Sequence, residues 1–166
     1  MRRVALMLWL GLCMHGYAQT KLILQPLETA PNPNLIRNAS FEQTQNDLPV
    51  GWVWDKRNTE ASVQVVTEPG ATGQFALKFT NATPFGAEIY AILRYEGGVP
   101  VQPSTVYTLS CRYKTREGYV GFIGGGDGWR VRLPLQDTGG QWKRAEITFA
   151  TRENESSLDL VIVIEA

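Results

Sequence analysis

The chain has 166 residues, and its 16 Lys and Arg residues balance its 16 Asp and Glu residues. Without a surplus of positive charge it lacks the electrostatic footprint of a nucleic-acid-binding protein, so no nucleic-acid partner is expected. The single histidine, His15, and one of the two cysteines, Cys13, both lie near the N-terminus.

Residues 1–18 have the organisation of a secretory signal peptide. Arg2 and Arg3 give a basic start, residues 4–14 form a nearly unbroken apolar run, and residues 16–18 place small residues at the expected cleavage site. The apolar run is shorter than the roughly 20 residues that a transmembrane helix requires, which disfavours a retained membrane anchor. We therefore predict a secreted, extracellular protein that has no membrane association once the signal is removed.

Removal of this signal leaves a chain without histidine and with Cys111 as its one cysteine. Such a chain has no Ser-His-Asp or Cys-His nucleophile, no histidine-ligated zinc and no histidine general base. It also has no intramolecular disulfide, and a chain of this length can bury a one-domain core without one. Cys111 is expected inside that core, because Tyr107, Leu109 and Tyr113 share its face of a strand-like run.

The rest of the chain shows the pattern of short β-strands. Residues 19–33 contain three prolines and no clear period, and are predicted to be a leader or linker. Alternation of apolar and polar residues is clearest in the runs 62–67, 74–80, 105–115, 141–150 and 157–165. Less regular runs span residues 35–37, 51–56, 88–95, 119–123 and 129–135. No helical period is sustained beyond the signal, so we predict an all-β fold, an antiparallel β-sandwich, over residues 34–166.

Four segments follow one another in a characteristic order: residues 34–42 (NLIRNASFE), 48–52 (LPVGW), 73–79 (GQFALKF) and 101–110 (VQPSTVYTLS). Together they resemble the carbohydrate-binding modules of the family 4, 9, 16 and 22 type, which share a galactose-binding-like jelly roll. The resemblance implies a monomeric, non-catalytic module that requires no cofactor. It would bind a polysaccharide, such as a β-linked glucan or xylan, and target an attached secreted glycoside hydrolase to it.

The aromatic residues fit such a role. Sugars present apolar C–H faces ringed by hydroxyl groups, and flat aromatic rings with charged or planar hydrogen-bonding groups beside them suit these ligands. Trp52 matches a core tryptophan of the family, and Trp142, at a strand start, is also expected to be structural. Trp54 shares the face of Trp52 in a regular strand, and becomes a sugar-stacking platform only if a bulge or strand end frees it.

The resemblance places sugar-stacking aromatic residues at Trp129, beside the glycine-rich loop 124–128, and at Phe85. For Trp129 the alternation argues the other way, because Val131 and Leu133 share its parity and favour burial in a regular strand. For Phe85 the alternative is a loop residue that plugs one end of the sandwich.

Charged and polar candidates complete the predicted site. The resemblance assigns a ligand-bonding carboxylate to Glu165 and a ligand-contacting arginine to Arg57. Tyr90 and Arg94 share one face of their strand and are added on that ground. A solvated charge at a strand end is the alternative for Glu165. The predicted carbohydrate-binding set is therefore Trp129, Phe85, Glu165, Arg57, Trp54, Tyr90 and Arg94.

One further residue concerns a metal. Glu42 matches the Phe-Glu position that often helps to hold a structural calcium in this fold, with backbone oxygens and a late Asp as partners. In the family that Asp lies in one more strand after a run like residues 158–165, and the sequence ends at Ala166 before it. We therefore expect a fragment of a longer enzyme whose module lacks its last strand, since loss of such a strand opens a sheet edge.

Two other functions are weighed against sugar binding. A structural or interaction β-sandwich would support a neighbouring catalytic domain without binding sugar. A jelly-roll glycosidase or lyase is disfavoured, because the mature chain has no histidine and no local pattern nominates the pair of carboxylates that glycoside hydrolysis requires.

Overall fold

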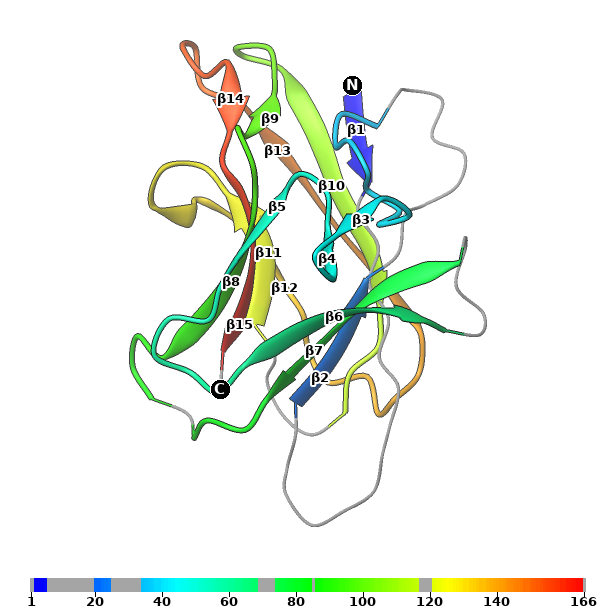
Figure 1. The fold of residues 1–166 in the computed structure, drawn as a ribbon. Helices are drawn as coiled ribbons and strands as arrows, with labels where there is room; N and C mark the ends of the chain where they lie inside the picture. The colour runs from blue at the N-terminus through cyan, green and yellow to red at the C-terminus, as the bar shows by residue number, and fades with distance from the viewer. Residues whose placement is uncertain are drawn as a thin grey trace.

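The computed structural model describes residues 2–5, 20–24, 34–68, 74–84, 86–116 and 121–165. Within these ranges the chain forms β-strands, one short 3₁₀ helix and no α-helix (Figure 1). No helix in this part of the chain is long and apolar enough to cross a membrane. The elements are β1 (Arg2–Ala5), β2 (Thr20–Leu24), β3 (Thr44–Gln45), β4 (Leu48–Pro49), β5 (Trp52–Asp55), β6 (Ser62–Thr67), β7 (Phe75–Asn81), β8 (Tyr90–Tyr95), β9 (Val99–Pro100), β10 (Val106–Tyr113), β11 (Gly121–Gly125), η1 (Asp127–Trp129), β12 (Val131–Pro134), β13 (Lys143–Ala150), β14 (Ser157–Leu158) and β15 (Leu160–Glu165).

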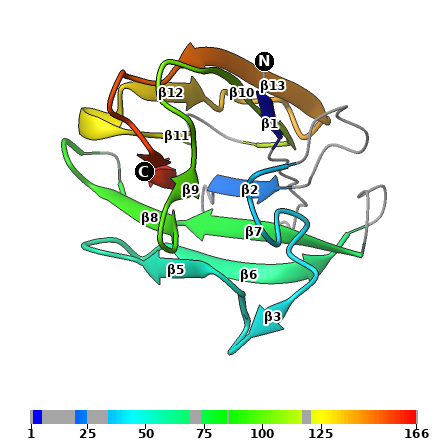
Figure 2. The ribbon, with the colours of Figure 1, turned by 90° about the horizontal axis from the view of Figure 1, so that it is seen from above.

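The strands form two layers (Figure 2). One layer is a five-stranded sheet in the order β12-β11-β15-β8-β5, in which every neighbouring pair is antiparallel. The other layer consists of two three-stranded sheets, β1-β10-β13 and β2-β7-β6, which are antiparallel except that β1 runs parallel to β10. The predicted all-β class and antiparallel sandwich are thus confirmed.

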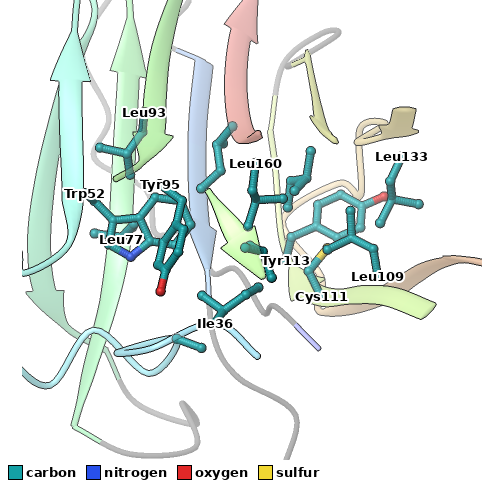
Figure 3. Packing of buried hydrophobic residues seen from close by; sticks show 14 of the residues in the cluster. Ile36, Trp52, Leu77, Leu93, Tyr95, Leu109, Cys111, Tyr113, Leu133 and Leu160 are labelled. Carbon is teal, nitrogen blue, oxygen red and sulfur yellow. The ribbon is translucent and has the colours of Figure 1, made fainter. Parts of the chain in front are cut away.

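The core lies between these two layers and follows from the alternation of the strands (Figure 3). Leu93 and Ile162 of the five-stranded sheet face Leu77 and Leu109 of the opposite layer, and all four are nearly or wholly buried. Such burial stabilises the fold by about 25 cal/mol per Å² of apolar surface removed from water. Cys111 belongs to the same cluster, as its strand parity predicts.

Trp52 is the central aromatic residue of this core. It is 5% exposed, and its ring centroid lies 5.9 Å from that of Phe41 and 5.3 Å from that of Tyr95, both in edge-to-face geometry. The expectation that Trp52 is structural is therefore confirmed. Edge-to-face pairs of this kind each add about 1 kcal/mol beyond the area that they bury.

The N-terminal segments take part in the second layer. Residues 20–24, which the sequence pattern assigns to a leader or linker, instead form β2 and pair with β7 along the whole of β2. Leu22, at the centre of β2, is completely buried in the core. The sequence pattern misses this short apolar strand because prolines dominate the rest of residues 19–33. β1 lies within the expected signal peptide, whose removal stays a prediction.

Candidate functional site

The five-stranded sheet has a second apolar cluster on the side away from the core. Ile92, Phe122, Val161 and Val163 alternate with core residues along β8, β11 and β15, and each is at most 3% exposed. Successive side chains of a strand point to opposite faces, so these four side chains belong to the outer side of the sheet. We call this side the outer face.

Two large aromatic residues cover the apolar floor of the outer face. Trp129 and Tyr90 are half-buried and pack against the four floor residues. The ring centroid of Trp129 lies 5.4 Å from that of Tyr90, edge to face, and 5.3 Å from that of Phe122. In the register of the sheet, Gly124 stands opposite Val161 and next to Arg132. A Cβ at Gly124 would collide with the Val131 carbonyl group, so the close approach of the neighbouring backbone requires glycine here.

The local backbone explains why Trp129 reaches the outer face. Trp129 ends the 3₁₀ turn η1, has a positive φ of 52°, and its N–H donates to the Gly126 carbonyl at 2.8 Å. A left-handed residue at this point breaks the period-two alternation before β12 begins. Val131 and Leu133 therefore enter the core while Trp129 does not share their face. The strand-parity argument for burying Trp129 fails because the residue precedes the regular strand.

Two arginines lie over aromatic residues of this face. The Arg57 guanidinium carbon lies 4.2 Å from the centroid of the Tyr90 ring, and that of Arg132 lies 3.9 Å from the centroid of Phe122. Cation–π contacts of this type contribute about 0.5–1 kcal/mol at exposed sites. Both arginines thus lie against aromatic rings and are exposed to solvent.

Two ion pairs also lie on the outer face. Arg132 donates to Glu165 at 2.8 Å, so its side chain reaches from β12 to β15. Arg94 of β8 donates to Asp159, just before β15, at 2.7 Å, and both side chains are about half exposed. Such exposed pairs contribute little to stability, about 1 kcal/mol or less. They hold hydrogen-bonding groups of both signs at fixed positions beside the aromatic residues.

A hollow of about 430 Å³ adjoins the aromatic cover at one end of the sheet. It is lined by Gly126, Asp127, Gly128, Trp129 and Asp159. It therefore combines an indole ring with two carboxylates. Asp127 and Asp159 are each paired with an arginine, Arg152 and Arg94.

Five of the seven predicted site residues come together on the outer face: Trp129, Tyr90, Arg57, Arg94 and Glu165. Trp54 does not join them. β5 is regular, so Trp54 stays on the face of Trp52 and packs against the core, with its ring 5.9 Å from that of Phe79. Phe85 lies outside the described residues.

The sequence pattern missed three members of the site: Phe122, Arg132 and Asp159. Arg132 alternates with Val131 and Leu133, so strand parity in the run 129–135 could have placed it on the outer face. Nothing local marks Asp159, because its role depends on Arg94, which lies 65 residues away in the sequence.

Glu42 lies far from this face and has a backbone-capping role. Its Oε1 accepts hydrogen bonds from the backbone N–H groups of Gln74, at 3.0 Å, and Phe75, at 3.2 Å, where β7 begins. In the ranges that the structure describes, no three His, Cys, Asp or Glu side chains are grouped as a metal site would need. Calcium binding at Glu42 therefore stays a prediction.

Trp142, the remaining tryptophan of the described residues, lies by the other layer. It is half-buried against the core, and the guanidinium carbon of Arg112 and the ammonium nitrogen of Lys114 lie 5.1 Å and 5.7 Å from its ring centroid. Its packing against the core agrees with the structural role expected for it.

Comparison with family models, with curated proteins and with solved structures finds no match to this chain. The resemblance to carbohydrate-binding modules therefore rests on the sequence segments alone, and the outer face has to be interpreted from its own chemistry.

Proposed function

We propose that this protein is a non-catalytic polysaccharide-binding module whose outer face holds a β-linked glucan or xylan chain. The proposal includes secretion and the targeting of an attached carbohydrate-active enzyme to its substrate. The single observation that carries it is the meeting of Trp129, Tyr90, Arg57, Arg94 and Glu165 on one sheet face. Aromatic rings beside fixed charged hydrogen-bonding groups are the combination that sugar recognition needs.

The dimensions of the face favour a chain over a single sugar. Strands in a sheet lie about 4.8 Å apart, so the centres of five strands span roughly 19 Å. The polar groups are also spread along the strands: Tyr90 lies opposite Glu165, and Arg94, opposite Val161, lies four residues or roughly 13 Å further along β8. A ligand that contacts both Glu165 and Arg94 must itself be extended. The hollow beside Trp129 lies at one end of this face.

A structural role is the competing function, and one observation favours it. The rings of Trp129, Tyr90 and Phe122 pack on one another, and the floor beneath them is almost fully buried. A second small core of this kind would strengthen the sheet without binding anything. The two functions differ in whether loss of the Trp129 ring affects ligand binding or only stability.

Affinity electrophoresis of the Trp129→Ala and Trp142→Ala variants separates the two functions. Gels would contain xylan, β-glucan, mannan or pectin, and thermal melting would confirm that each variant is folded. Both tryptophans are half-buried, so both variants should lose stability to a similar degree. Only Trp129→Ala should lose retardation by the polysaccharide that slows the wild type.

Two results would reject the proposal. One is a folded wild type that none of the four polysaccharides retards. The other is a Trp129→Ala variant that is less stable but binds as well as the wild type, which would assign the outer face to the structural role.

A further inference from the structure

The outer face contains one arginine that differs from the others. Arg94 and Arg132 each pair with a carboxylate, and so do Arg130 and Arg152 at its edge. Arg57 instead lies over the Tyr90 ring. In the described part of the chain, no carboxylate oxygen lies within 4.0 Å of a guanidinium nitrogen of Arg57.

The backbone around Arg57 is held in place by local hydrogen bonds. The Asp55 carboxylate accepts a hydrogen bond from the Arg57 backbone N–H at 2.9 Å, and Thr59 donates through both its N–H and its hydroxyl to the Lys56 carbonyl. Thr59 is itself 3% exposed. Asp55 is the nearest acid in the sequence, and it binds the backbone of Arg57 instead of neutralising its side chain.

Stacking leaves the donors of Arg57 available. A guanidinium is planar, and its five N–H groups lie in that plane. The Arg57 guanidinium carbon lies 4.2 Å from the Tyr90 ring centroid, and in the described part of the chain none of the guanidinium N–H groups donates to a protein acceptor. This arrangement suits two parallel hydrogen bonds to a carboxylate or sulfate group, which are about twice as strong as bonds between neutral groups.

We propose that the outer face recognises a polysaccharide that carries anionic groups, and that Arg57 pairs with a carboxylate or sulfate of the chain. This inference rests on the proposed function and names the ligand class of the same site. A neutral sugar hydroxyl would leave the Arg57 charge without a counterion, whereas a uronic acid or a sulfate ester supplies one. The neighbouring Tyr90 and Trp129 rings would contact the apolar side of the same chain.

The test uses ligands that differ only in charge. Affinity electrophoresis would compare glucuronoxylan with the same polymer after reduction of its carboxyl groups, and carrageenan with its desulfated form. The first pair tests carboxylate recognition and the second tests sulfate recognition. Each measurement would be repeated at high salt, which weakens exposed charge interactions.

Arg57→Gln removes the charge and keeps much of the length of the side chain. Arg37→Gln is the matched control. Arg37 is also exposed, and its backbone N–H donates to the Tyr95 hydroxyl on the inner side of the sheet. Both variants change the net charge equally, so any difference between them cannot come from net charge. Arg57→Lys keeps the charge without the planar fork and provides a second test.

We expect at least one charged polymer to bind better than its uncharged partner. Arg57→Gln should weaken that binding by about tenfold, Arg57→Lys by less, and Arg37→Gln should leave it unchanged. Binding of the uncharged polymer should weaken less, because Arg57 then makes only hydrogen bonds to neutral groups. The polymer pair that shows the difference identifies the anionic group.

Two results would overturn the inference alone. One is equal binding of charged and uncharged polymers, and the other is an equal effect of Arg57→Gln and Arg37→Gln. Polysaccharide binding itself would survive both. Absence of binding to all four polymers and to the neutral β-glucan and mannan would instead reject the proposed function, and the inference with it.

Discussion

Leu22 offers a direct test of whether residues 20–24 belong to the folded domain. Its side chain has no exposed surface, and it lies at the centre of β2, opposite Phe79 of β7. Replacing a fully buried leucine with alanine removes buried apolar surface and leaves a cavity, which costs about 3 kcal/mol. For a domain of this size that loss lowers Tm by about 9 °C, at about 3 °C per kcal/mol.

Circular dichroism would monitor the urea and thermal unfolding of the full chain and of its Leu22→Ala variant. Val53→Ala is the control, because Val53 is also apolar and in a strand but is 50% exposed. Its loss should stay below about 1 kcal/mol. If the free energy of unfolding of Leu22→Ala lay within about 0.5 kcal/mol of the wild-type value, β2 would contribute no core packing. Residues 20–24 would then be a leader, as the sequence pattern predicts.

Two further predictions concern Glu42 and Cys111. Glu42→Ala removes the oxygen that accepts hydrogen bonds from the backbone N–H groups of Gln74 and Phe75, and should lower the free energy of unfolding by about 1 kcal/mol. Glu42→Gln keeps an acceptor oxygen, so its free energy of unfolding should fall by less. Equal losses in urea unfolding would contradict the capping role. Burial raises the pKa of the Cys111 thiol, so the native protein should not react with a thiol-specific disulfide reagent at pH 8 and should react once urea unfolds it. Rapid reaction of the native protein would contradict this burial.

Much of the sheet geometry was predictable from local alternation. Strand parity predicts that Tyr90 and Arg94 point to the other side of the sheet from Leu93. It predicts the same for Glu165 relative to Ile164, and the structure agrees in both cases. Parity works here because both strands are regular and one of their faces must be buried. The same argument correctly keeps Trp54 on the face of Trp52.

Local pattern was insufficient wherever the chain leaves a regular strand. Trp129 has the parity of a core residue, but the left-handed turn that ends η1 moves it to the outer face. β2 was missed because its five residues adjoin a proline-rich segment. A strand this short is defined by its partner β7, and that partner is distant in the sequence.

By itself, the sequence determines the all-β fold class and shows which face of each regular strand is apolar, because period-two alternation is a local property. It also determines the supply of aromatic and charged side chains. Only the tertiary structure decides which of these side chains meet. Arg132 pairs with Glu165 across the intervening strand β11, and Arg94 pairs with Asp159, because the strand order β12-β11-β15-β8-β5 brings distant segments together. Arg57 is left without a carboxylate among the described residues for the same reason: pairing depends on distance in space, which the order of residues alone does not specify.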